Sequence, residues 1–113
     1  MGPRAKTIEF LGGSLDDLRA FPVSIRRDAG YQLDRVQQGL DPSNWKPMKT
    51  IGPGVREIRL RDANGAFRIV YVAKVRDDVV VLHCFQKKTQ ATSRTDIELA
   101  RKRYRDLLKE MER

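Results

Sequence analysis

Residues 55–85, "VREIRLRDANGAFRIVYVAKVRDDVVVLHCF", indicate three consecutive β-strands joined by two tight turns. The first strand is expected over residues 55–61, the second over 66–75 and the third over 78–85. Asn64-Gly65 is a strong short-range hairpin signal between the first two strands. This stretch therefore predicts an antiparallel meander, which decides the fold class.

The first of these strands has one apolar and one charged face. Its side chains alternate strictly, so that Ile58 and Leu60 point one way while Glu57, Arg59 and Arg61 point the other. The third strand is instead apolar on both faces over residues 79–82, as expected for a strand at the centre of a sheet covered on both sides.

Helical patterns flank the meander. A short strand in residues 7–13 precedes a first helix capped by Ser14, and Pro22 suits the first turn of a second helix. Gly39 is expected to end that second helix. The apolar positions at helical spacing in the second helix are Ile25, Ala29, Leu33, Val36 and Leu40.

A last helix follows the meander, with Thr95 and Glu98 as a capping box. The apolar stripe expected on this helix consists of Ile97, Ala100, Tyr104, Leu108 and Met111. Residues 41–54, which hold three prolines and two glycines, are expected to form a loop. The order predicts an α+β fold in one domain, residues 1–113, with a helical hairpin before a small antiparallel-rich sheet and a helix after it.

The charge of the chain favours a polyanionic partner. Its 113 residues carry a net charge of +8, and residues 51–113 alone hold fifteen basic and nine acidic side chains. A lone cysteine excludes an internal disulfide, and no apolar run approaches the roughly 20 residues that cross a bilayer. We therefore expect a cytoplasmic protein that does not contact the membrane.

Metal and cofactor chemistry are not expected. The single histidine and the single cysteine, His83 and Cys84, occupy adjacent strand positions that point to opposite faces, without paired carboxylates. Cys84 is expected to be a small buried side chain without a catalytic base. No glycine-rich loop precedes a helix in the manner of a nucleotide site.

The remaining chemistry is cationic. Five basic side chains come from the three strands of the meander and the turn that follows it: Arg59, Arg61, Arg68, Lys87 and Lys88. Strands joined by hairpins lie under about 5 Å apart, so these groups can converge. A solvated strand face and a charged strand end are the alternative interpretation. Arg68 is the informative member, because a cation between Phe67 and Ile69 needs a partner or an anion.

A converged cationic set suits cleavage of RNA through its own 2′-hydroxyl. One group deprotonates that hydroxyl, others neutralise the pentacoordinate phosphate, and a further donor protonates the leaving oxygen. Tyr71 and Phe85 are candidates for stacking on an unpaired base, although a place in the core is the simpler interpretation of both rings.

The segments "GPGVREIRLRD", "FRIVYVAK", "VVVLHCFQKKTQ" and "DIELARKRYRDLL" resemble the RelE/HigB-type toxins of bacterial toxin–antitoxin pairs. The likeness is strongest to the phage-related branch that carries a Leu-His-x-Phe-x-Lys-Lys-Thr-Gln run. It covers nearly the whole chain and implies a RelE-like fold.

The resemblance implies a metal-independent mRNA endonuclease that acts in the ribosomal A site. It also implies a helix-turn-helix antitoxin as protein partner, with DNA contacted only indirectly through that antitoxin. Arg68 falls on the strand arginine that contacts the scissile phosphate in the family, and Lys87 and Lys88 fall in the segment that supplies further catalytic cations.

The chain departs from the family pattern in three places. Phe67 stands where a tyrosine is common, Ala91 stands where some relatives have a cation, and the C-terminal tyrosine that some members use is absent. The proton donor is therefore unassigned, with Lys87, Lys88 and His83 as the catalytic candidates beside Arg68. The candidate RNA-binding residues are Arg59, Arg61, Tyr71, Phe85, Gln90 and Arg94.

Two other functions remain open from the sequence. A superfamily relative that poisons DNA gyrase would share the fold and catalyse no hydrolysis. A basic RNA-binding module would lose affinity steeply with salt and yield no cleaved product.

Overall fold

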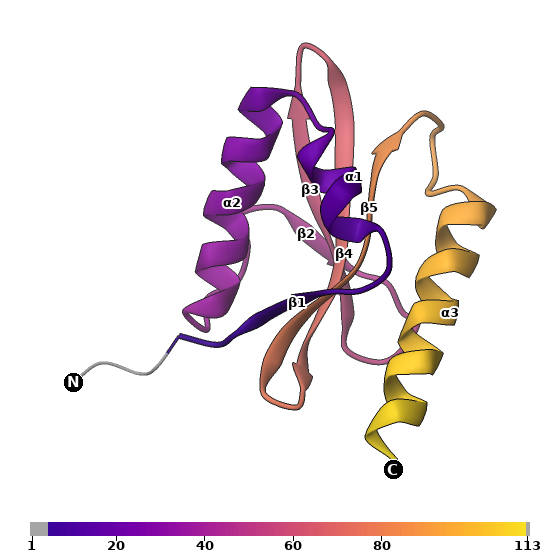
Figure 1. Cartoon of the computed structure of the whole chain (residues 1–113). Coiled ribbons are helices and arrows are strands. Elements are labelled where there is room, and N and C mark those ends of the chain that lie inside the picture. The colour runs from indigo at the N-terminus through magenta and orange to yellow at the C-terminus, as the bar shows by residue number, and fades with distance from the viewer. Residues whose placement is uncertain (1–4, 113) are drawn as a thin grey trace.

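The computed structural model describes residues 5–112 and has the expected α+β fold. Helices lie on both sides of one sheet, and α3 descends along the side opposite α2 (Figure 1). The elements in chain order are β1 (Ile8–Phe10), α1 (Ser14–Arg19), α2 (Val23–Gln37), β2 (Trp45–Pro47), β3 (Val55–Asp62), β4 (Gly65–Val75), β5 (Asp78–Lys87) and α3 (Arg94–Met111).

The sheet has five strands in the order β1-β5-β4-β3-β2. The predicted meander is confirmed, because β3 pairs antiparallel with β4 and β4 pairs antiparallel with β5. The short β1 adds parallel to β5, as its position before the helical hairpin allows. The sequence did not reveal β2, since three residues that include a proline carry no readable alternation and pair only because β3 lies beside them.

The face of the sheet that α2 covers, here called the α2 face, is apolar. Ile25, Ala29, Leu33 and Val36 of α2 are buried there as predicted. The prediction that Leu40 belongs to the apolar stripe is wrong, because Leu40 follows the end of α2 and is 52% exposed. The sheet residues packed in this layer are Ile58, Leu60, Phe67, Ile69, Tyr71, Val79, Val81 and Cys84.

The opposite face, here called the α3 face, is apolar only where α3 lies over it. The helix contributes Ala100, Tyr104 and Leu107 to this layer. Leu108 and Met111, expected in the stripe, are 37% and 40% exposed. The sheet and loop residues packed against the helix are Met48, Ile51, Val55, Val70, Val72, Val75, Val80, Leu82 and Phe85.

Two expected helix caps are wrong. Ser93 caps α3 by accepting a hydrogen bond from the backbone N–H of Asp96, so the helix begins before the predicted Thr95-Glu98 box. Ser14 is the first residue of α1 and makes no cap; its buried hydroxyl donates to the Val81 carbonyl at 3.5 Å. The Ser14 hydroxyl is thus taken up by a tertiary contact with β5, whereas Ser93 makes a local cap directly before the first residue of α3.

A β-bulge in β5 changes which side chains share a face. Tyr71 of β4 lies opposite Val81 and Val70 lies opposite His83, so Leu82 has no partner in the pairing register. Strict alternation would place every odd-numbered side chain of β5 on the α2 face with Val81. The bulge transfers the odd-numbered residues beyond it to the α3 face.

Candidate nucleic-acid interface

The end of the α3 face that α3 does not cover carries a cationic cleft. The cleft has a volume of about 530 Å³, and the residues that line it are Arg61, Ala66, Arg68, Lys87, Lys88, Thr89 and Gln90. A neighbouring hollow of about 490 Å³ shares Arg61 and Arg68 with the cleft and adds Asn44, Arg59 and Leu60. Four of the five predicted cations therefore line one cleft, and Arg59 lies beside it.

The strand register explains this convergence. Arg61, Ala66 and Lys87 form one row across β3, β4 and β5, because Ala66 is paired with both cations. Directly opposite side chains share a face of the sheet, so Arg61 and Lys87 flank a residue with only a methyl group. The small side chain of Ala66 leaves the space between the two cations open.

The bulge in β5 is what brings Lys87 to this cleft. Phe85 is paired with Arg68 and packs in the layer of α3, whereas Val81, the same number of residues from His83 on the other side, packs in the layer of α2. Without the extra residue at Leu82, Lys87 would project from the α2 face. Its place beside Arg68 thus depends on the bulge.

Arg68 is buried at the base of the cleft, with 3% of its surface exposed. Its Nε lies 3.3 Å from Oε1 of Glu57, which is fully buried, and neither of these two atoms has a hydrogen-bond partner among the described residues. Its Nη1 donates to the Phe67 carbonyl at 3.0 Å. Glu57 therefore neutralises one cation of the set and orients it.

The other cations of the cleft are not neutralised in this way. Among residues 5–112, no ion pair joins Arg59, Arg61, Lys87 or Lys88 to a carboxylate. Arg59 lies directly opposite Arg68 in the register. Like charges directly opposite one another destabilise a sheet, so this arrangement costs folding free energy while no anion is bound.

The crowding also affects acid–base properties. Burial lowers the pKa of Arg68, which Glu57 partly offsets by raising it, while Arg59 and Arg61 lower it further. For Lys87 the pKa is lowered by desolvation first, and then by repulsion from Arg68 and Lys46. A lysine with a lowered pKa holds more of its amine neutral near physiological pH, as a proton acceptor must.

Tyr71 and Phe85 do not offer stacking surfaces, which corrects their place among the RNA-binding candidates. Tyr71 is 1% exposed within the α2 layer, and Phe85 is 8% exposed beneath the stacked imidazole of His83. An unpaired base needs an accessible ring face, which neither residue presents.

Of the candidate RNA-binding residues Gln90 and Arg94, only one lies at the cleft. Gln90 lines the cleft and is exposed. Arg94 lies in the first turn of α3, where its Nε donates to Glu98 at 2.9 Å, and it does not line the cleft. Of this pair only Gln90 belongs to the site.

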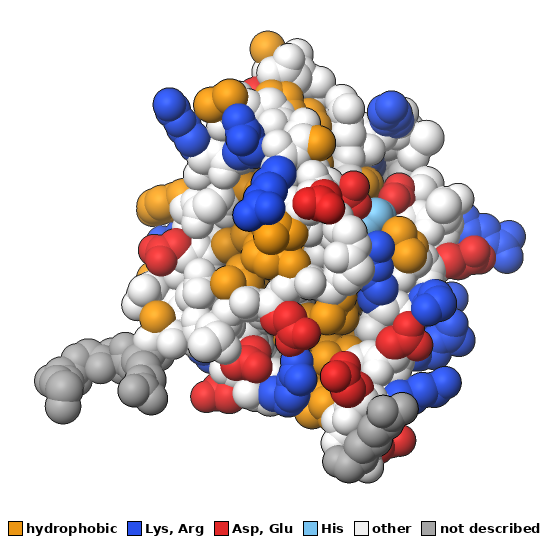
Figure 2. Space-filling model, viewed as in Figure 1, with side chains coloured by type: hydrophobic (Ala, Val, Ile, Leu, Met, Phe, Trp, Pro, Cys, Tyr) orange, Lys and Arg blue, Asp and Glu red, His pale blue; other side chains and the backbone are white. Residues whose placement is uncertain are grey.

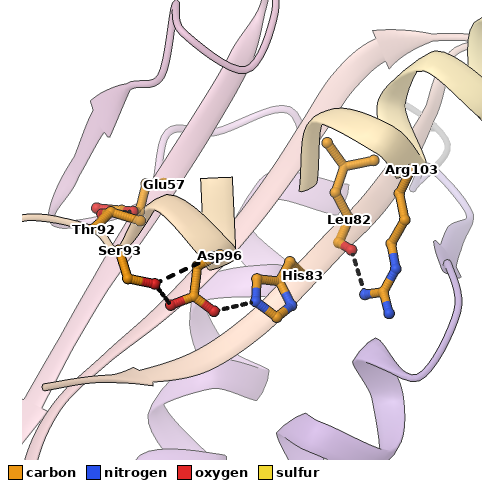
Figure 3. Close-up of polar contacts among 7 residues, drawn as sticks. All are labelled: Glu57, Leu82, His83, Thr92, Ser93, Asp96 and Arg103. Atoms are coloured by element: carbon orange, nitrogen blue, oxygen red, sulfur yellow. Dashed lines mark hydrogen bonds and ion pairs between the residues drawn. The ribbon is translucent and has the colours of Figure 1, made fainter. Parts of the chain in front are cut away.

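His83 takes part in a different network. Its Nε2 lies 2.7 Å from Oδ1 of Asp96, while the Ser93 hydroxyl donates to Oδ2 of the same carboxylate (Figure 3). His83 is buried and does not line the cationic cleft. Its position favours a role in attaching the start of α3 to β5.

Two residues that the sequence interpretation did not select stand out in the structure. Glu57 and Thr92 are both buried, and the Thr92 hydroxyl donates to Oε2 of Glu57 at 2.8 Å (Figure 3). The alternation of β3 already places Glu57 on the face of Arg59 and Arg61. No local sequence pattern indicates that Thr92 is buried and hydrogen-bonded, because its partner Glu57 lies 35 residues away.

On the side that carries β1 and α1, acidic and basic side chains are mixed (Figure 2). Within the part of the chain that the structure describes, no three His, Cys, Asp or Glu side chains are grouped so that they could hold a metal ion. None of the helices in residues 5–112 is long and apolar enough to span a bilayer.

A search of curated proteins finds no significant match. The family model described as "Phage derived protein Gp49-like (DUF891)" matches residues 16–105, a range that includes every residue of the cationic cleft. The chain therefore belongs to this Gp49-like family, which is phage-derived and toxin-like.

Proposed function

We propose that this protein, as one domain of residues 1–113, is the toxin of a toxin–antitoxin pair and an mRNA endonuclease of RelE/HigB type. The observation that carries the proposal is the meeting of Arg61, Arg68, Lys87 and Lys88 in one cleft at the uncovered end of the sheet. Membership of a toxin-like family supports the same conclusion.

Folding alone gives no reason for this arrangement. Arg59 lies directly opposite Arg68 on the neighbouring strand, and Arg61 and Lys87 lie in one row on either side of Ala66. A bound polyanion removes this repulsion and turns an unfavourable arrangement into a favourable one. The phosphodiester backbone of single-stranded RNA supplies such charges at regular spacing.

The residues divide the reaction as follows. Arg68 binds a non-bridging oxygen of the scissile phosphate, and the neutral amine of Lys87 accepts the proton of the 2′-hydroxyl. A new bond forms between O2′ and phosphorus while the bond from phosphorus to O5′ breaks, and the Lys88 ammonium donates a proton to the leaving oxygen. The products are a 2′,3′-cyclic phosphate and a 5′-hydroxyl end.

The partners follow from the family resemblance. Messenger RNA in the ribosomal A site is the substrate, and Arg59, Arg61 and Gln90 contact its backbone. A helix-turn-helix antitoxin neutralises the toxin and links it indirectly to DNA. The reaction takes place in the cytoplasm.

The test uses exposed or half-exposed cations, whose removal leaves the core intact. Lys87→Ala and Arg61→Ala are compared with Lys74→Ala, which removes an exposed cation from the far end of β4. Because general base catalysis typically contributes about 10²–10⁴-fold, Lys87→Ala should lower the rate of RNA cleavage by at least about 100-fold. Lys74→Ala should cleave at the wild-type rate.

Cleavage is measured on a short RNA and on ribosome-bound message, and growth arrest is scored after induction in cells. Equal cleavage by wild type and Lys87→Ala would remove Lys87 from the mechanism. Intact message alongside DNA damage would favour a gyrase poison. Salt-dependent binding of RNA without a cleaved product would favour a binding module.

A further inference from the structure

Glu57 is a fully buried carboxylate directly beneath the cationic cleft. A buried charge is costly unless it is paired and hydrogen-bonded. Its charge partner is Arg68, but the contact of 3.3 Å between Oε1 and Nε lacks hydrogen-bond geometry. The hydrogen bond that Glu57 does accept comes from the Thr92 hydroxyl, at 2.8 Å to Oε2.

Residues 88–91 form an exposed segment, and Thr92, which follows them directly, is buried. This segment carries Lys88 and Gln90, which line the cleft. The next residue, Ser93, bonds to Asp96, and Asp96 holds His83 of β5. The two neighbouring hydroxyls therefore bond to different carboxylates, that of Thr92 to Glu57 and that of Ser93 to Asp96. The segment is thus attached to β3 at Thr92 and to β5 through Asp96.

The first of these attachments joins the segment to the catalytic arginine. Without the Thr92 hydroxyl, the torsion angles of the Glu57 side chain are no longer fixed by a hydrogen bond. The Nε of Arg68 depends on the position of that carboxylate, because it has no other partner among the described residues. A change at Thr92 is therefore transmitted through Glu57 to the guanidinium group.

We propose that Glu57 and Thr92 are positioning residues that hold Arg68 and the segment of residues 88–91 in the geometry that the reaction needs. This inference rests on the proposed function. Neither residue contacts RNA: Glu57 fixes the direction of the Arg68 guanidinium group, and Thr92 fixes Glu57. The separate Asp96 contact keeps the start of α3 in place when the Thr92 hydroxyl is removed.

The test compares Thr92→Val, which keeps the shape and removes the hydroxyl, with Thr92→Ser, which keeps the hydroxyl. Because the hydrogen bond from Thr92 goes to a charged group, Thr92→Val should lower kcat for cleavage by about tenfold or more. The KM for RNA should change by less than about twofold, because the exposed cations that attract the backbone are untouched. Thr92→Ser should restore most of kcat.

Thr95→Val is the matched control. It makes the same substitution in the first turn of α3, at an exposed threonine with no side-chain hydrogen bond among the described residues. It should leave kcat and KM at wild-type values. All variants are assayed well below their unfolding temperatures, so that loss of folded protein does not contribute.

A second readout does not depend on cleavage. The Nε–H signal of Arg68, observed by nuclear magnetic resonance, should be sharp in wild type and Thr92→Ser and broadened in Thr92→Val. An unchanged signal together with an unchanged kcat in Thr92→Val would overturn the positioning role. Equal losses in Thr92→Val and Thr92→Ser would also overturn it. Failure of the wild type to cleave RNA would instead overturn the proposed function and this role with it.

Discussion

The two faces of the central sheet differ in how completely a helix covers them. The α2 face is apolar from Val79 to Phe67, because α1 packs on β5 and α2 packs across β3, β4 and β5. The α3 face is apolar around Val72 and Val80 but becomes charged at Arg59, Arg61 and Arg68, where α3 no longer lies over it (Figure 1). One sheet therefore provides a core layer on one side and both a core layer and a cleft on the other.

The difference between the two faces shows how a small protein can fold stably although several like charges lie close together in one cleft. Adjacent residues of β3, Ile58 and Arg59, face opposite ways, one completely buried and one in the cationic region. The apolar layers supply the free energy of folding, while the uncovered end keeps like charges close together. The variants below alter either the charged end of the α3 face or the buried residues of the sheet.

The largest effect is expected when one member of the buried ion pair is removed. Arg68→Met leaves Glu57 as an unpaired buried charge, so the free energy of unfolding should fall by about 3–5 kcal/mol. Adding Glu57→Leu removes that charge and extends the apolar part of the α3 face, so the double variant should regain at least half of the loss. Both variants should be unable to cleave RNA.

Urea denaturation measures the free energies, and cleavage is assayed under conditions in which each variant is folded. A double variant no more stable than Arg68→Met would show that the pair does not interact as described. Cleavage by the folded double variant would remove Arg68 from the mechanism.

A smaller effect of opposite sign is expected at Arg59. Arg59→Gln removes a like charge opposite Arg68, which should stabilise the protein by about 0.2–1 kcal/mol in the absence of RNA. The same change should weaken RNA binding and reduce the salt dependence of log K by about 0.7 for each phosphate that the variant no longer neutralises. Thermal unfolding and RNA titrations at several salt concentrations measure the two effects.

Arg56→Gln is the control for this prediction. Arg56 lies on the same strand but on the other face, where it lies over the Trp45 ring at 3.8 Å and donates to Asp41 at 2.8 Å. Its removal should lower stability and leave RNA binding unchanged. A gain in stability from both variants would mean that net charge, rather than the pairing with Arg68, sets the effect.

The smallest effect concerns chemical reactivity along β5. Burial raises the pKa of the Cys84 thiol to about 12, so the folded protein should resist alkylation at pH 8. Because the folded pKa lies above the ordinary value of 9.0, stability from the protonated thiol is complete below pH 9 and is lost as pH rises toward 12.

Lys87, three residues further along, has a lowered pKa and should react faster with an amine-acylating reagent than the exposed Lys74. Mass spectrometry after brief labelling measures both residues in one sample. Rapid alkylation of Cys84 in the folded state, or slower acylation of Lys87 than of Lys74, would contradict the burial and crowding described for this strand.

Much of the fold could be predicted from the sequence because its signals are local. The alternation of residues 55–61, the Asn-Gly turn and the helical spacing from Ile25 to Val36 each depend on neighbours in the chain. Errors occurred where a distant contact intervened. Ser14 bonds to the distant Val81, and β2 forms only because β3 lies beside it. The start of α3 is a different case, because the sequence offers two local hydroxyls, Ser93 and Thr95, and Ser93 is the one that caps the helix.

The candidate site was predictable in its composition but not in its geometry. Arg68 within an apolar strand, and the Lys87-Lys88 pair at a strand end, were visible from their positions in the sequence. Tyr71 and Phe85 were named among the candidate RNA contacts, but both rings are buried, in agreement with the simpler interpretation that they belong to the core.

The sequence alone determined the three-stranded meander, the helices that flank it, the buried positions from Ile25 to Val36 and the number of cations. These features follow from short-range periodicity and residue type. Only the tertiary structure decided that Lys87 lies on the same face of the sheet as Arg68, since an unpaired Leu82 shifts the alternation of β5. It also decided that Glu57 and Thr92 meet beneath the cleft, 35 residues apart. The physical reason is that register and burial depend on contacts between distant segments, which no local pattern records.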